Sequence, residues 1–146
     1  MKKYKKFFEN KLKGFHYSDE YFKNFEDKYI IALGHNFSLN NESTKSFGKY
    51  LYICELNIKK VFNRDNDTFN SNISKNIIDY YNLNNLFIKY NSNSIDFNKI
   101  LHNSSYNNIR NLLLDLNYNS IYSHRWGGTY IMLNSKDIKI LKIIEN

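Results

Sequence analysis

Proline is absent from this sequence, and cysteine occurs once, at Cys54. A lone cysteine excludes an internal disulfide bond and cannot by itself form a zinc site, so we expect a reducing compartment. No apolar run reaches the about 18 residues that span a bilayer, and the basic segment 1–13 lacks the continuous apolar stretch of a secretory signal. The sequence therefore predicts a soluble, cytoplasmic protein without a membrane partner.

The sequence also lacks several motifs of well-known binding sites. It contains neither a P-loop nor a Gly-x-Gly-x-x-Gly pattern, so it gives no support to a Walker or a Rossmann site. His35 and His102 have no carboxylate or cysteine at metal-ligand spacing, and we expect no metal.

Aromatic side chains, by contrast, are abundant. The 146 residues include 13 tyrosines, 11 phenylalanines and the single tryptophan Trp126. This much apolar surface is incompatible with a disordered chain, and the length suits one domain over residues 1–146.

Positive charge is in excess, with a formal net charge of +7. Part of the excess lies near the N-terminus, at Lys2, Lys3, Lys5, Lys6, Lys11 and Lys13. Segment 2–12 has apolar residues at helical spacing, which predicts a basic N-terminal helix within residues 1–13 that ends at Gly14. Such a helix suits phosphates or an acidic partner, although a plain solvated helix face has the same pattern.

The remaining elements are short and mixed. We expect extended segments at 15–18, 29–33, 50–57, 120–124, 129–133 and 138–144, and helices at 19–25, 40–47, 77–86 and 105–116. Both faces of 50–57 are apolar, which indicates a central strand, whereas the polar segment 63–76 reads as a surface loop. Strands clustered late in the chain favour an α+β fold over a regular βαβ repeat.

Three separated motifs carry a resemblance to a known family. They are Gly14-Phe15-His16-Tyr17-Ser18, the segment 34–48, and the final strands 119–140 with the turn Gly127-Gly128-Thr129. Together they resemble the His-Tyr-Glu branch of the ADP-ribosyltransferase superfamily, over about residues 14–57 and 109–142. The resemblance implies a split mixed or antiparallel β-sheet with short flanking helices, and it makes residues 63–100 a variable insert.

The resemblance also implies NAD as cofactor and assigns residues to it. His16 would hold the ribose, although Tyr17 stands where the family has glycine. Phe47 takes the place of the signature tyrosine that stacks on nicotinamide, with Tyr50 or Tyr52 as alternatives. The full set implied to bind cofactor is His16, Tyr17, Ser18, Phe37, Ser38, Phe47, Tyr50 and Tyr52.

Thr129 stands where the family has its catalytic glutamate, so His16 and Thr129 are the implied catalytic residues. The missing negative charge would cost about 100-fold in rate. Three alternatives follow. An acidic side chain of the target supplies the charge, a remote carboxylate such as Glu55 or Asp115 supplies it, or the protein binds without reacting.

His124, Arg125 and Trp126 precede the glycines of the last hairpin, near the position of the family's target-recognition loop. A cationic and aromatic tip suits a phosphate or nucleic-acid partner. The alternative is a turn whose tryptophan covers the edge of the sheet.

Two functions are therefore expected as alternatives. The first is a mono-ADP-ribosyltransferase that uses NAD to modify a macromolecule of a bacterial host, as phage effectors such as a CRISPR inhibitor do. The second is an inactive member of the fold, a basic protein that binds and blocks a nucleic-acid-handling complex.

Overall fold

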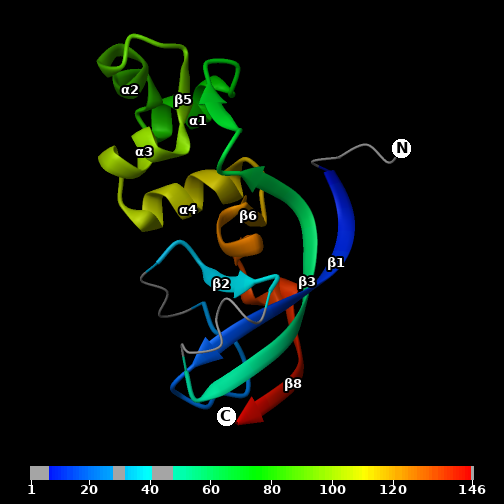
Figure 1. Ribbon diagram of the computed structural model, residues 1–146. Coiled ribbons are helices and arrows are strands. Elements are labelled where there is room, and N and C mark those ends of the chain that lie inside the picture. The colour runs from blue at the N-terminus through cyan, green and yellow to red at the C-terminus, as the bar shows by residue number, and fades with distance from the viewer. Residues whose placement is uncertain (1–6, 28–31, 41–47, 146) are drawn as a thin grey trace.

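The computed structural model describes residues 7–27, 32–40 and 48–145. Its elements are mixed, as expected for an α+β fold, with most helices gathered at one end of a curved sheet (Figure 1). Within the described residues, none of the helices combines the length and the apolar character needed to cross a membrane.

One mixed sheet organises the chain. Its strands are β1 (Phe7–Ser18), β2 (His35–Ser38), β3 (Tyr50–Asn63), β6 (Ser120–Ser123), β7 (Thr129–Met132) and β8 (Ile138–Glu145). The order is β1-β2-β7-β6-β3-β8, and β1 also pairs with β3. Five strands thus form a closed circuit of pairings, which β8 extends along β3. Between β1 and β2 the register contains the single pair Phe15 and Ser38.

The central strand β3 explains the interior of this circuit. Tyr52, Cys54, Leu56 and Ile58 alternate along β3 and are fully buried. Residues with this spacing lie on one face of a strand, so β3 lines the core over its whole middle. The strand expected at 50–57 is confirmed, and it continues to Asn63 because β1 and then β6 pair with it.

The expected N-terminal helix is wrong from Phe7 onward, while residues 1–6 lie outside the described ranges. Residues of β1 pair antiparallel with β3, for example Leu12 with Leu56. Gly14 lies inside β1, where an added Cβ would stand 2.7 Å from Leu56 Cδ1. The helical spacing of apolar residues was overridden by long-range pairing, and the glycine serves the close approach of two strands.

Several other expected elements differ as well. Residues 19–25 form bends without a helix, and the segments 28–31 and 41–47, with Phe47, lie outside the described residues. The supposed loop 63–76 contains β4 (Thr68–Asn70), which pairs with β5 (Ser94–Asp96). The helix expected at 77–86 is two helices, α1 (Lys75–Tyr80) and α2 (Leu83–Lys89), because Asn82 adopts φ 55° between them.

The remaining helices complete a second core. α3 (Phe97–Asn103) was not expected, whereas α4 (Tyr106–Asp115) confirms the expected helix, with Ser105 Oγ accepting from Asn108 N as its cap. Ile109, Leu112 and Leu113 of α4 are buried against Phe62 and Ile121 in one cluster. Side chains from residues 63–100 join the same cluster, so this segment is part of the core rather than a surface decoration.

Candidate functional site

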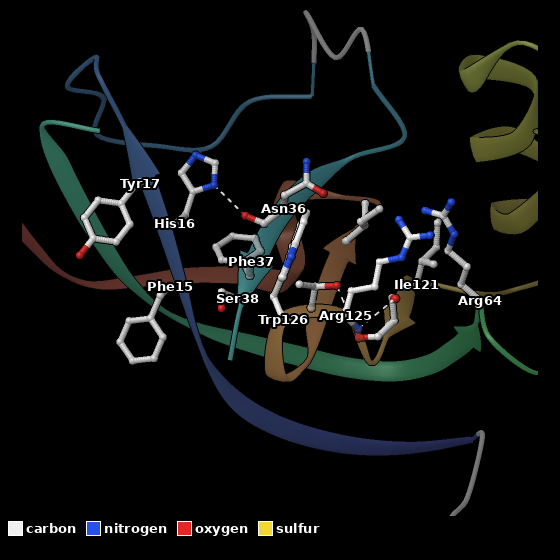
Figure 2. A pocket seen from close by; sticks show the side chains of 13 residues that line it. Phe15, His16, Tyr17, Asn36, Phe37, Ser38, Arg64, Ile121, Arg125 and Trp126 are labelled. Carbon is white, nitrogen blue, oxygen red and sulfur yellow. Dashed lines mark hydrogen bonds between the residues drawn. The ribbon is translucent and has the colours of Figure 1, made fainter. Parts of the chain in front are cut away.

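A cavity of about 410 Å³ opens on one face of the sheet (Figure 2). It is lined by Phe15, His16, Tyr17, Asn36, Phe37, Ser38, Arg64, Ile121, Ser123, Arg125, Trp126, Thr129 and Ile131. A concave site of this volume is within the range that holds small ligands.

Strand register decides which side chains form its floor. Ser38 is paired with Phe15 on β1 and with Thr129 on β7, and Thr129 is paired with Ser123 on β6. Paired residues project from the same face, so these four side chains share it. Residues two positions away, such as Tyr17, Asn36 and Ile131, lie on this face too.

His16 lies on the opposite face of β1. Figure 2 shows its ring turned toward Asn36, away from the side from which Phe15 and Tyr17 project. Its Nδ1 donates to the Asn36 carbonyl at 2.7 Å, and its ring packs 5.2 Å from Phe25 and 5.6 Å from Phe37 between ring centroids. Burial among these rings lowers the pKa of His16 more than the hydrogen bond raises it. His16 and Thr129 therefore line one cavity with side chains on different faces.

The described lining of the cavity gives Thr129 no carboxylate as a neighbour. Thr129 Oγ1 donates to the Ser123 carbonyl at 3.4 Å, and no aspartate or glutamate is among the described lining residues. Glu55 is instead ion-paired with Lys11, and Asp115 accepts a hydrogen bond from Tyr81 on the helical side. Neither remote carboxylate lines the cavity.

Two arginines stand at one end of the cavity. The backbone N of Arg64 donates to the Tyr122 carbonyl at 2.8 Å, which fixes Arg64 beside β6. Its guanidinium lies 4.9 Å from the centroid of Phe97, and burial and the neighbouring charge of Arg125 lower its pKa. Neither arginine forms an ion pair with a carboxylate in the part of the chain described.

The turn that carries Arg125 has an unusual backbone. The 3₁₀ segment η2 (Arg125–Gly127) places Trp126 at φ 52°, followed by Gly127 at φ 80° and Gly128 at φ 109°. Trp126 is 75% exposed. A bulky residue in the left-handed region is strained, and such strain concentrates at functional sites.

Hydrogen bonds between His124 and Asp65 anchor this turn. His124 Nδ1 donates to Asp65 Oδ2 at 2.6 Å, and the backbone N of His124 donates to the same oxygen at 2.9 Å. Burial opposes the charge of Asp65, but the hydrogen bonds from His124 outweigh it and lower the pKa of Asp65. His124 is thus occupied with holding the turn and does not line the cavity.

Of the residues that the sequence predicted for the site, the cavity brings together His16, Tyr17, Phe37, Ser38, Arg125, Trp126 and Thr129. It does not include Ser18, Tyr50 or Tyr52. Tyr52 is fully buried, and its Oη accepts from Phe22 N at 2.6 Å and donates to the Phe22 carbonyl at 2.9 Å.

Sequence reasoning missed Arg64, Phe15 and Asn36. Arg64 follows β3, and only the parallel pairing of Asn63 with Tyr122 brings it beside the last hairpin. The residues around Arg64 in the sequence give no indication of this long-range pairing. Alternation along β1, in contrast, would have placed Phe15 with Tyr17.

The described residues offer no metal site. No group of three or more His, Cys, Asp or Glu side chains in the described ranges could hold a metal ion. Burial raises the pKa of Cys54 to about 12, so its thiol remains protonated and unreactive at neutral pH.

Neither a family model nor a curated protein matches the chain. Among solved structures, the fold is similar to the one described as "Crystal structure of an anti-CRISPR protein", with a TM-score of 0.54 and 15% sequence identity. The match covers 92% of this chain and 96% of that one. These comparisons give no support to the ADP-ribosyltransferase resemblance.

Proposed function

We propose that this protein is a phage-type inhibitor of a bacterial CRISPR system. The observation that carries the proposal is the structural similarity to an anti-CRISPR protein over nearly the full length of both chains. A net charge of +7 adds to it, because a basic protein is attracted to complexes that carry nucleic acid.

The site favours inhibition by binding. The cavity presents Arg64, Arg125 and the exposed ring of Trp126, and its described lining contains no carboxylate to serve as a general base or to stabilise a cation. Exposed aromatic and arginine side chains are typical of residues that dominate binding energy at interfaces. The partner is then a protein or nucleic-acid complex of the host.

Phage plating tests the proposal directly. Strains with different active CRISPR systems would express the full chain and be infected with a phage that each system targets. For one system, we expect plaque numbers to rise by orders of magnitude over the empty vector and no rise in a strain that lacks the system. Unchanged plating across the systems tested would contradict the proposal.

Charge-reversal variants locate the inhibitory surface. Arg125→Glu should abolish the rise in plating, whereas Lys142→Glu, at an exposed lysine of β8 outside the cavity, should retain it. Both variants change the net charge equally. Equal inhibition by the two variants would place the inhibitory surface elsewhere.

ADP-ribosyl transfer with NAD is a second candidate. It is favoured by the hydroxyl of Thr129 and the rings of Phe15 and Tyr17 in one ligand-sized cavity, with two arginines suited to a pyrophosphate. Dinucleotide binding would use these side chains, but the described lining lacks the negative charge on which transfer depends, so the target would have to supply a carboxylate. Intact-mass spectra of effector subunits after incubation with NAD test this, since a gain of one ADP-ribose would support transfer and unchanged masses would contradict it.

A further inference from the structure

The cavity combines cationic and aromatic side chains. Arg64 and Arg125 provide two cations at one end, and Trp126 offers an aromatic surface beside them (Figure 2). Phe15 and Tyr17 add aromatic surface on the β1 side. Cationic groups next to aromatic platforms suit a chain of alternating phosphates and flat bases.

The two arginines are close enough to repel each other, which favours an anion bound between them. Neighbouring like charges repel, and this repulsion contributes to the lowered pKa of Arg64. Asp65 interacts electrostatically with both arginines, but its carboxylate already accepts hydrogen bonds from His124. An anion between the guanidiniums would remove the repulsion, and phosphate oxygens accept from arginine in a bidentate manner.

The shape of the site selects the form of nucleic acid. A cavity of about 410 Å³ admits single bases or nucleotides, whereas a duplex presents paired bases that cannot enter. Trp126 protrudes on a strained turn that the hydrogen bonds of His124 with Asp65 hold in place. An exposed aromatic ring in this position can stack on an unpaired base.

We propose that this cavity binds single-stranded nucleic acid, with Arg64 and Arg125 holding a phosphodiester and Trp126 stacking on an adjacent base. The inference rests on the proposed function for its biological setting. The partner would be an unpaired segment of the RNA or DNA in the host CRISPR complex. The protein would recognise the charge of the phosphate backbone and the flat faces of the bases, so binding is independent of base sequence.

Trp126 provides the measurement, because it is the only tryptophan in the chain. The full-length protein would be titrated with a ten-nucleotide oligothymidylate at low salt while the tryptophan emission is followed. We expect saturable quenching by the single strand and much weaker quenching by a duplex of the same length. No quenching, or equal quenching by the duplex, would overturn the inference.

Variants separate charge from stacking. Fluorescence anisotropy of a labelled oligothymidylate should show about tenfold weaker binding for Trp126→Ala, with Trp126→Phe recovering most of the affinity. Arg64→Ala and Arg125→Ala should each weaken binding and lower the salt slope by about 0.7, while Lys142→Ala leaves both unchanged. Equal losses with Lys142→Ala would indicate nonspecific attraction to the net charge and overturn the inference.

A competition experiment addresses an acidic protein segment as the occupant. Polyglutamate of matched charge should fail to displace the oligonucleotide, because it offers no base for Trp126. Displacement at equal charge would overturn the inference in favour of an acidic peptide. These results are independent of plating: inhibition that persists without oligonucleotide binding refutes only the inference, and binding without inhibition refutes only the proposed function.

Discussion

Asp27 shows how one side chain can join segments that are distant in sequence. Its carboxylate accepts from His35 Nε2 at 2.9 Å and from the backbone N and Oγ of Ser135, each at 2.9 Å. Burial opposes its ionisation, but these hydrogen bonds outweigh burial and lower the pKa of Asp27 from 3.8. The charged form is therefore favoured in the folded state.

Asp27→Asn should lower the free energy of unfolding at pH 7 by about 1 kcal/mol, a modest value because the side chain is partly exposed. Since the folded pKa is depressed, the contribution of Asp27 is complete well above pH 3.8 and is lost as the pH falls through the folded pKa. Urea unfolding at pH 7 and pH 3 checks this. A difference between wild type and variant that is as large at pH 3 would contradict it.

His16 gives a second pH dependence, in another range. Its pKa is lowered from 6.5, chiefly by burial among aromatic rings, so the unfolded chain binds the proton more readily. Stability should then fall as the pH drops below 6.5 towards the folded pKa, and it should be unaffected by His16 above that range. In the His16→Phe variant, the urea concentration at the unfolding midpoint should change less between pH 7 and pH 5 than in the wild type. An equally large change in the variant would show that other groups cause the pH dependence.

At the scale of elements, Asn119 fastens β3 to the final strands. Its Oδ1 accepts from Lys59 N at 3.1 Å and Lys60 N at 3.3 Å, and its Nδ2 donates to the Asn57 carbonyl at 2.8 Å and to Asp137 Oδ2 at 3.1 Å. Asn119 and Asp137 are both buried. Removal of the amide would leave several buried polar groups without partners.

Asn119→Ala should therefore destabilise the fold by about 3 kcal/mol and lower Tm by roughly 10 °C. Calorimetry of the variant beside Asn107→Ala, at an exposed position of α4, checks this, and the control should retain the wild-type Tm. A similar Tm for both variants would mean that water replaces the lost amide.

The elements differ in how far they could be predicted from sequence. α4 and the strands near the C-terminus carry their own signals, a polar cap with an apolar stripe and short apolar runs bounded by glycine. β1 does not, because its apolar spacing fits a helix and only its pairing with β3 makes it a strand. The break at Asn82 was equally hidden, because asparagines are so frequent in this chain that the sequence does not show which of them adopts the left-handed conformation.

At the scale of the whole molecule, the cavity combines residues from distant parts of the chain. Phe15, Arg64 and Thr129 meet there because β1, β3 and β7 belong to one circuit of pairings. The hairpin tip with Arg125 and Trp126 could be proposed from sequence, since a tip is local. The neighbourhood of Arg64 could not, because it depends on the parallel pairing of β3 with β6.

The contact between β1 and β2 has a mechanical consequence. This junction in the circuit contains the single pair Phe15 and Ser38, and both residues lie in the cavity. Separation of β1 from β2 would break few backbone hydrogen bonds, whereas β1 and β3 are paired along most of their length. An incoming ligand that separated Phe15 from Ser38 would enlarge its own binding site while the rest of the circuit of pairings stayed intact.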